Sequence, residues 1–333
     1  MKPTSTRRRL LASAGAAGLL TGTGLPIRSA RAQASDWPSK PLRVIVAFAP
    51  GGLTDAYARM FAEQFTAAYK QPAVVDNKPG AGGNIAIESL TKSPADGYTV
   101  LFATSGALWQ NRVLYSKLPF DLAKDIAPIA FYPSGPLVFG VGPKTPGSTV
   151  AEVLEHARKK PSSMGSYAPA SYPHMLAAQF NRQHGTQLQA IHYRGEAPMW
   201  IDVVSGQIEM AVGSFQAFNT VASKGVRAVG VTGGYRSPRL PDVPTLAEQG
   251  IRDELVTLEG GLPMVARTGT AEDILRKLAA VAVEGNDTPR AATLRENFAI
   301  PNKALGLEET RAIWRDAAPI WIRNAQALGV KLD

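Results

Sequence analysis

The residues best suited to binding a ligand lie in short loops that follow expected strands. Pro50, Gly51 and Gly52 separate an apolar stretch, 42–48, from a stretch with helical periodicity. Glycines let the backbone turn and approach a ligand closely, and their amides would lie beside the positive end of the helix. The loop is therefore a candidate anion site. The alternative is an ordinary tight turn between a strand and a helix.

Thr54 and Asp55 come directly after this loop, and two interpretations of them stay open. Both residue types are good N-terminal caps, so a purely structural role accounts for them. Asp55 could instead accept a hydrogen bond from a ligand amine or from an ordered water.

Two further loops have residues that could contact a ligand. Thr104, Ser105 and Gly106 follow the expected strand 98–103, a position that often binds ligands in α/β folds, although hydroxyl-rich turns are also common. The glycine loop 79–84 lacks the third glycine of a dinucleotide fingerprint and the Lys of a P-loop, so a structural loop is favoured there.

Catalysis has little support in the sequence. There is no nucleophile elbow, no Ser-x-x-Lys at a helix start and no His-Glu-x-x-His. His174 and His192 could each act as a general base, but a lone histidine is more often a packed or hydrogen-bonded residue. With no cysteine and only four histidines, thiolate metal sites and iron–sulfur clusters are excluded. We expect no enzyme activity, no metal and no cofactor.

The net charge of +9 is concentrated at the N-terminus. Residues 1–32 contain six basic residues and no acidic ones, so the remainder has 30 basic and 27 acidic residues, a net charge of +3. A nucleic-acid-binding face is not indicated.

The order of a basic segment, a small-residue apolar stretch and Ala30-Arg31-Ala32 is that of a secretory signal, with cleavage after Ala32. We expect export to the periplasm by the Sec or the twin-arginine (Tat) route, or, as the alternative, a basic tail on a cytosolic protein.

The body of the chain alternates strands with helices, which argues for parallel sheets covered by helices. The expected strands are 42–48, 73–76, 98–103, 137–141, 166–168, 189–193, 209–212 and 226–232. The expected helices are one after Gly52 with Tyr57, Met60, Phe61 and Phe65 on its apolar face, and 85–91, 149–159, 172–184, 197–205, 245–249, 271–283 and 307–327. Two such series suggest two α/β domains, 33–138 plus 246–333 and 139–245, with a ligand cleft between them.

Seven segments resemble one family in order. The stretch 37–55, WPSKPLRVIVAFAPGGLTD, is similar to the opening of the tripartite tricarboxylate transporter substrate-binding receptors, the Bordetella uptake gene (Bug) family. Blocks at 76–84, 95–99, 118–121, 192–198, 205–209 and 236–245 follow in the family's order.

This resemblance implies a two-domain periplasmic binding protein of the Venus-flytrap kind, with a hinge of two crossing strands. It also implies a monomeric receptor that delivers a small organic acid to an inner-membrane tripartite tricarboxylate-type transporter. The ligand-binding residues that it implies are Phe48, Pro50, Gly51, Gly52, Thr54, Asp55, Thr104, Ser105, Gly106, Ser171, Tyr172, His174, Tyr193 and Gly195.

The second-domain loop, 167–174, departs from the family pattern. It is about three residues shorter, lacks both family glycines and contains two prolines, which have no N–H to donate. Tyr172 could replace the lost backbone contacts with an aromatic face and favour an aromatic or compact carboxylate over citrate. Alternatively, Tyr172 packs within its domain and the ligand is an ordinary aliphatic diacid. A periplasmic hydrolase of small acids and a ligand-sensing partner of a membrane sensor remain the alternative functions.

Overall fold

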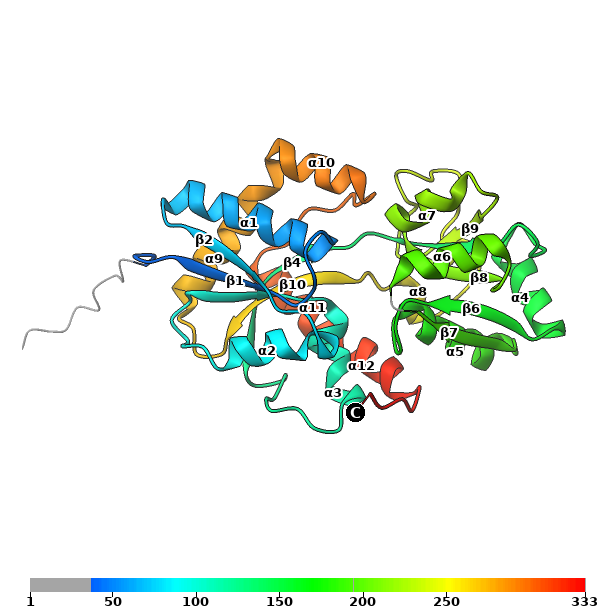
Figure 1. Cartoon of the computed structure of the whole chain (residues 1–333), viewed down its shortest axis with the longest axis horizontal. Helices are drawn as coiled ribbons and strands as arrows, with labels where there is room; N and C mark the ends of the chain where they lie inside the picture. Colours follow the sequence, from blue (N-terminus) through cyan, green and yellow to red (C-terminus); the bar gives the residue numbers. More distant parts are fainter. Residues whose placement is uncertain (1–36, 194, 333) are drawn as a thin grey trace, which may run out of the picture. The chain divides into compact units, whose positions relative to one another are not determined.

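The computed structural model describes residues 37–193 and 195–332. The expected export signal, 1–32, and its cleavage after Ala32 lie outside these residues. The described chain forms two five-stranded sheets with helices packed on them (Figure 1).

The first sheet has the strand order β2-β1-β3-β10-β4. Its strands are β1 Leu42–Val46, β2 Ala73–Asn77, β3 Thr99–Phe102, β4 Ile126–Pro133 and β10 Gly261–Arg267. Strand β1 pairs in parallel with β2 and β3, whereas β10 runs antiparallel to both β3 and β4. The sheet is therefore mixed, and the expectation of parallel sheets alone was wrong.

The second sheet has the order β7-β6-β8-β5-β9. Its strands are β5 Leu137–Val141, β6 Ser162–Ser166, β7 Leu188–His192, β8 Met210–Ser214 and β9 Arg227–Val231. Strand β6 is parallel to β7 and β8, and β5 is antiparallel to β8 and β9. The strand expected at 166–168 was misplaced, because β6 ends at Ser166 and the following residues form the turn before α5.

Strands β4 and β10 were not predicted from the sequence: no element was expected at 126–133, and helices were expected to dominate after residue 245. Both strands contain proline, which cannot donate a ladder hydrogen bond; β4 is an edge strand, where proline is tolerated, but β10 is central. The structure accommodates Pro128 beside a register shift between Met264 and Val265, and Pro263 in β10 still uses its carbonyl to accept the Ala103 amide at 3.3 Å.

Helices cover both faces of the first sheet. Successive side chains of β1 point to opposite faces, and each face packs against its own hydrophobic core. Val44 and Val46 face the cluster that contains Phe61 of α1, and Ile45 faces the cluster that contains Ile87 of α2. The helices that come after strands of this sheet along the chain are α1 Leu53–Tyr69, α2 Asn84–Thr91, α3 Asn111–Leu114, α9 Glu272–Glu284, α10 Pro289–Asn297, α11 Leu307–Asp316 and α12 Ala318–Gln326.

The strands of the second sheet alternate along the chain with α4 Val150–Lys159, α5 Tyr172–His184, α6 Glu196–Ser205 and α7 Phe215–Ala222, and α8 Glu254–Thr257 lies between β9 and β10. Helix α4 begins with a complete capping box, in which Thr149 and Glu152 each accept the other's backbone amide. The helix expected at 245–249 was wrong, because these residues form turns. The single helix expected at 307–327 is two helices, α11 and α12, with Pro319 in the first turn of α12.

The order of the strands along the chain is consistent with a first domain made of two separate chain segments. Strands β5 to β9 all belong to the second sheet, and β10 returns to the first. The domain limits 33–138 plus 246–333 and 139–245 remain a prediction.

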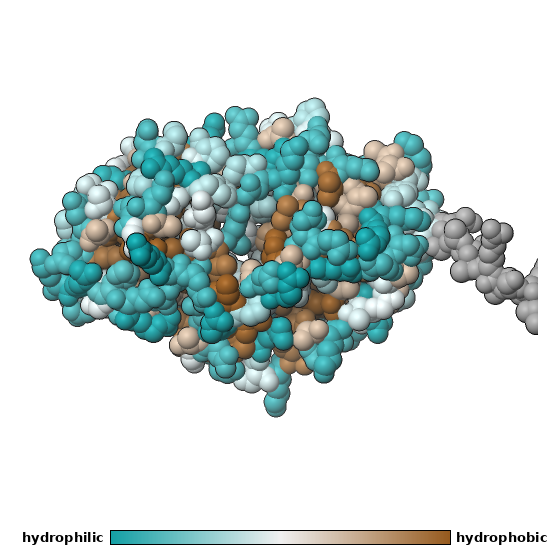
Figure 2. Space-filling model, turned by 180° about the vertical axis from the view of Figure 1, so that it is seen from behind, coloured by the Kyte–Doolittle hydropathy of each residue, from teal (hydrophilic) through white to brown (hydrophobic). Residues whose placement is uncertain are grey.

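On the face drawn in Figure 2, hydrophilic residues cover most of the surface and apolar residues occupy mainly its recesses. Within the described ranges, none of the helices is long and apolar enough to cross a membrane.

Candidate ligand-binding site

The first candidate loop connects β1 to α1 and exposes Pro50, Gly51 and Gly52. Gly51 has φ +95°, a conformation that side chains rarely adopt, so a glycine is required there. Gly52 is the N-cap of α1 and, lacking a side chain, leaves the first-turn amides without a side-chain acceptor. The loop thus presents backbone amides and the positive end of a 17-residue helix to solvent.

Asp55 holds this loop from inside the protein. Its Oδ2 accepts the Gly51 amide at 3.0 Å and Arg59 Nε at 2.9 Å, and its Oδ1 accepts Asn77 Nδ2 at 3.0 Å. Burial alone would raise the pKa of Asp55, but the hydrogen bonds from Arg59, Gly51 and Asn77 outweigh it and hold the pKa below its ordinary value. Both carboxylate oxygens are therefore engaged within the protein, and the Gly51 amide is already donated to Asp55.

The neighbouring predicted residues differ in accessibility. Thr54 is buried, and Phe48 is half-buried against the core. Of the loop that follows β3, Ser105 is also buried: its Oγ donates to the Gly261 carbonyl at 3.0 Å and accepts the Gly261 amide at 3.2 Å. Thr104 Oγ1 accepts the Ala107 amide at 3.2 Å. The two hydroxyls thus fix the turn onto β10 and onto the π-helical residues 106–110.

The second candidate loop lies between β6 and α5. Ser171 is the N-cap of α5, but its hydroxyl bonds to Ser166 Oγ at 2.8 Å and does not cap the helix. Ala170 has φ +54°, and its amide donates to His174 Nδ1 at 3.0 Å. This bond assigns the ring proton of neutral His174 to Nε2, so Nε2 is a hydrogen-bond donor.

His174 lies against His192, with ring centroids 4.5 Å apart. Burial, with a further contribution from His192, lowers the pKa of His174 to about 4. Burial also lowers the pKa of His192. Both rings are therefore neutral at pH 7, and His174 offers a ligand a neutral hydrogen-bond donor.

Tyr172 is directed into the protein. It is only 4% exposed, its hydroxyl donates to the Leu255 carbonyl at 3.0 Å, and its ring lies 5.7 Å from that of Trp321. Tyr172 is thus packed inside the protein, as in the alternative, but both partners lie in 246–333 and not in its own predicted domain. An aromatic wall facing a ligand does not follow from it.

The third loop begins α6 at Gly195, which has φ +104° and donates its amide to the Tyr167 carbonyl at 3.1 Å. The hydroxyl of Tyr193 donates to Asp202 Oδ2 at 2.7 Å. Burial, together with this bond to Asp202, raises the pKa of Tyr193 to about 12.

The sequence analysis did not single out Glu196 or Ser214, which join two helix starts. The carboxylate of Glu196 accepts the Ser214 amide at 3.0 Å and its Oγ at 2.5 Å. Burial raises the pKa of Glu196, against the opposing effect of these hydrogen bonds. No local sequence signal pairs two residues that are 18 positions apart.

One contact joins the segment that follows β3 to the helix that follows the second candidate loop. Gln110, at the end of the turn that follows Thr104, approaches Met175 of α5 with Nε2 3.3 Å from Sδ. The starts of α1, α5 and α6 all lack side-chain caps, but so do those of α2, α9 and α11. A missing cap alone therefore does not identify a site.

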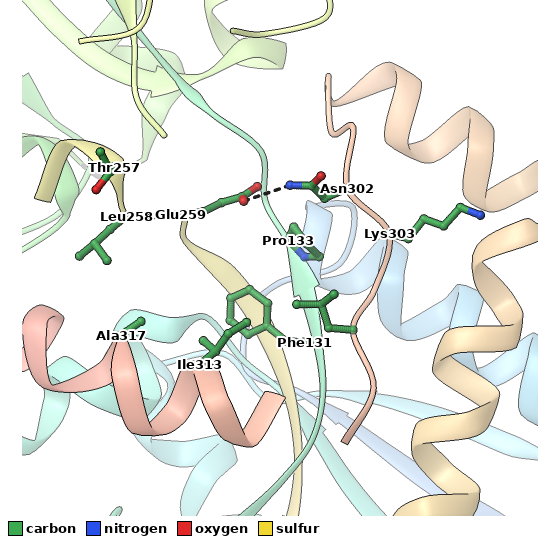
Figure 3. Close-up of a pocket in the computed structure, with 10 residues that line it drawn as sticks. Phe131, Pro133, Thr257, Leu258, Glu259, Asn302, Lys303, Ile313 and Ala317 are labelled. Atoms are coloured by element: carbon green, nitrogen blue, oxygen red, sulfur yellow. Dashed lines mark hydrogen bonds between the residues drawn. The ribbon is translucent and has the colours of Figure 1, made fainter. Parts of the chain in front are cut away.

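Two cavities have walls formed by other residues. One, of about 340 Å³, is lined mainly by apolar side chains with Glu259 and Asn302 at its rim (Figure 3). The other, of about 210 Å³, is polar and lies around Lys144, Lys160 and Glu209. Across the described residues, no three His, Asp or Glu side chains are grouped so that they could hold a metal ion.

Two α/β sheets with this arrangement define the periplasmic-binding-protein class. The solved structure of R. palustris Rpa4515 with adipate matches with a TM-score of 0.74 and 28% identity, over 89% of this chain and all of the other. The structure of the periplasmic binding protein BugD matches with a TM-score of 0.71 and 25% identity, over 89% of this chain and all of the other.

The chain belongs to the tripartite tricarboxylate transporter family receptors (TctC), whose match covers residues 57–314. It is 32% identical to a protein encoded between tcbD and tcbE in Pseudomonas sp. strain P51, over 96% of this chain and 88% of the relative. It is 31% identical to BugT of Bordetella pertussis, over 73% of this chain and 74% of BugT. The family resemblance is confirmed, and the family is one of binding proteins, not of enzymes.

Proposed function

We propose that the exported chain is a monomeric receptor that captures a small aliphatic dicarboxylate in the periplasm and delivers it to a tripartite tricarboxylate-type transporter. The observation that carries the proposal is the exposed Gly51–Gly52 turn at the uncapped start of α1. The amide of Gly51 is held by Asp55, so the Gly52 amide and those of the first turn of α1 are the donors left for a carboxylate.

The second carboxylate is assigned to the region of His174. Its Nε2–H is a donor because Nδ1 is occupied by the Ala170 amide. Two groups of donors, one after β1 and one after β6, suit a ligand with two separated carboxylates. The relative solved with adipate, at 28% identity, supports this ligand class. The buried position of Tyr172 favours an aliphatic diacid over a benzoate-type ligand.

Titration calorimetry of residues 33–333 tests this function. The ligands are adipate, succinate, citrate and benzoate at one pH and ionic strength. We expect adipate or succinate to bind best, with the ligand recovered unchanged. Saturation at 100 times the dissociation constant should stabilise the fold by about 2.7 kcal/mol. Preferred binding of citrate or benzoate would contradict the assigned ligand class, and conversion of the ligand would contradict a receptor.

A further inference from the structure

The two chain segments that connect the sheets are hydrogen-bonded to each other. One runs from the end of β4 at Pro133 to the start of β5 at Leu137, and the other arrives from β9 and enters β10 at Gly261. The Ser134 amide donates to the Gly260 carbonyl at 3.1 Å. This bond extends the β4–β10 pairing to the point where the chain leaves the first sheet.

Glu259 lies directly before this bond and gathers donors from its own connecting segment, from the other connecting segment and from the loop between α10 and α11. Its Oε1 accepts Tyr235 Oη at 2.5 Å, and its Oε2 accepts Asn302 Nδ2 at 3.2 Å. Asn302 Nδ2 is also 2.9 Å from Tyr235 Oη, and the Gly135 amide bonds to the carboxylate. Figure 3 shows the Glu259–Asn302 bond at the rim of the larger cavity.

Apolar packing alone does not hold these segments together, because a cavity of about 340 Å³ lies beside them. Phe131, Leu258 and Ile313 form walls of that cavity. Atoms that face a void lose dispersion contacts on that side. A second tie, the ion pair of Arg239 with Glu296 at 3.6 Å, is exposed and contributes little. The Glu259 network is therefore one polar connection among the crossing segments, beside the Ser134–Gly260 bond and the exposed ion pair of Arg323 with Glu254.

We propose that Glu259 is a positioning residue for ligand binding, which holds the crossing segments so that the loops of the two sheets can engage one ligand. Its bonds to Tyr235, Asn302 and Gly135 restrict the angle between the sheets in the unliganded protein. This inference rests on the proposed function for its effect on affinity, but the restriction itself requires no ligand.

A purely stabilising role would change the melting temperature in Glu259→Gln without broadening the distances between the two sheets. Burial is the largest effect on the pKa of Glu259 and raises it, although the bonds from Tyr235, Asn302 and Gly135 act in the opposite direction. Glu259→Gln keeps the size of the side chain but places an amide nitrogen against one of the donors that the two oxygens now accept, so the network loses an acceptor. Charge-assisted hydrogen bonds are stronger than neutral ones, so the substitution should still loosen the network.

The test is a distance measurement between spin labels in the full mature chain. The sequence has no cysteine, so Ala68→Cys on α1 and Ala151→Cys on α4, both exposed, give two unique label sites. Glu259→Gln is compared with Glu248→Gln, the same change at an exposed carboxylate of the same connecting segment that pairs with Arg236 and not with Tyr235 or Asn302. Tyr235→Phe removes one donor and leaves Glu259 in place.

We expect the unliganded distance distribution to broaden in Glu259→Gln and in Tyr235→Phe, and not in Glu248→Gln. Adipate affinity should fall about threefold or more, since apparent affinity falls with the fraction of molecules that are competent to bind. Unchanged distributions in both network variants would overturn the proposal. If adipate fails to bind the unsubstituted protein while the distributions broaden, the proposed function fails and the positioning role of Glu259 stands.

Discussion

The carboxylate of Asp55 accepts the amide of Gly51, four residues earlier, at 3.0 Å. Gly51 lies outside the helix in a left-handed conformation, so this bond closes the turn onto the first turn of α1. Arg59 and Asn77 hold the same carboxylate in place. The candidate ligand-binding loop is therefore shaped by a buried side chain whose two carboxylate oxygens already have partners within the protein.

Asp55→Asn should destabilise the protein by about 1 to 3 kcal/mol and weaken ligand binding, because one amide nitrogen would replace an acceptor that now faces donors. Denaturant unfolding at pH 7 measures the first effect. The pKa of Asp55 is lowered in the fold, so the ionised carboxylate contributes stability above its ordinary pKa of 3.8. The difference between the two proteins should shrink as the pH falls below that value; a constant difference would contradict the ionised network.

Lys70→Gly should raise the free energy of unfolding by about 0.5 to 1 kcal/mol. Lys70 ends α1 with φ +57° and donates its amide to the Thr66 carbonyl, a conformation that glycine adopts without strain. Lys70→Ala is the control, since it removes the same side-chain amine but keeps the strained conformation. Equal stability of the two variants would show that the left-handed turn carries no cost here.

Stability should fall as the pH falls from about 6.5 to about 4, partly because of His174. Its pKa is lowered from 6.5 to about 4, so in this window the unfolded chain takes up a proton that the folded chain does not. His174→Asn can retain an acceptor for the Ala170 amide and removes this titration. It should reduce the loss of stability across the window by about 1 to 2 kcal/mol, once solvent screening is allowed for. An unchanged pH profile in the variant would contradict the assignment.

The exported protein should begin at or near Gln33 and be monomeric. The motivation is the sequence Ala30-Arg31-Ala32 after a basic and an apolar segment. Intact-mass analysis of a periplasmic extract, followed by light scattering, measures both properties. A periplasmic protein that retains residues 1–32 would contradict the predicted cleavage.

How far the sequence predicts the structure depends on the range of the interactions. Helix α5 and strand β5 have the predicted bounds, since proline, glycine and apolar periodicity are local signals. The central position of β10 was not predictable from its own residues, because Pro263 is disfavoured in a central strand and pairing partners lie far away in the chain.

The candidate site shows the same division. Gly51 and Gly52 were predicted to form the loop before α1, and they do so. The buried orientation of Tyr172 depends on Leu255 and Trp321, which are 83 and 149 positions away, and the paired bonds of Ser105 depend on Gly261. Local sequence patterns contain no information on such distant partners.

The most direct test of the central claim is the adipate affinity of Gly52→Asp compared with Gly52→Asn. Gly52 has an ordinary φ of −83°, and a Cβ there meets no atom within 4 Å, so both side chains fit and both are good N-caps. They differ in charge, and a fixed carboxylate should occupy or oppose the proposed anion position at the start of α1.

Gly234→Asp, at another exposed glycine whose φ is ordinary and where an added Cβ meets no atom within 4 Å, controls for the added charge alone. Titration calorimetry should give adipate binding at least about tenfold weaker in Gly52→Asp than in Gly52→Asn, a difference of about 1.4 kcal/mol. Both Gly52 variants should be at least as stable as the unsubstituted protein. Equal adipate affinity in Gly52→Asp and Gly52→Asn would contradict the claim that this loop binds a ligand carboxylate.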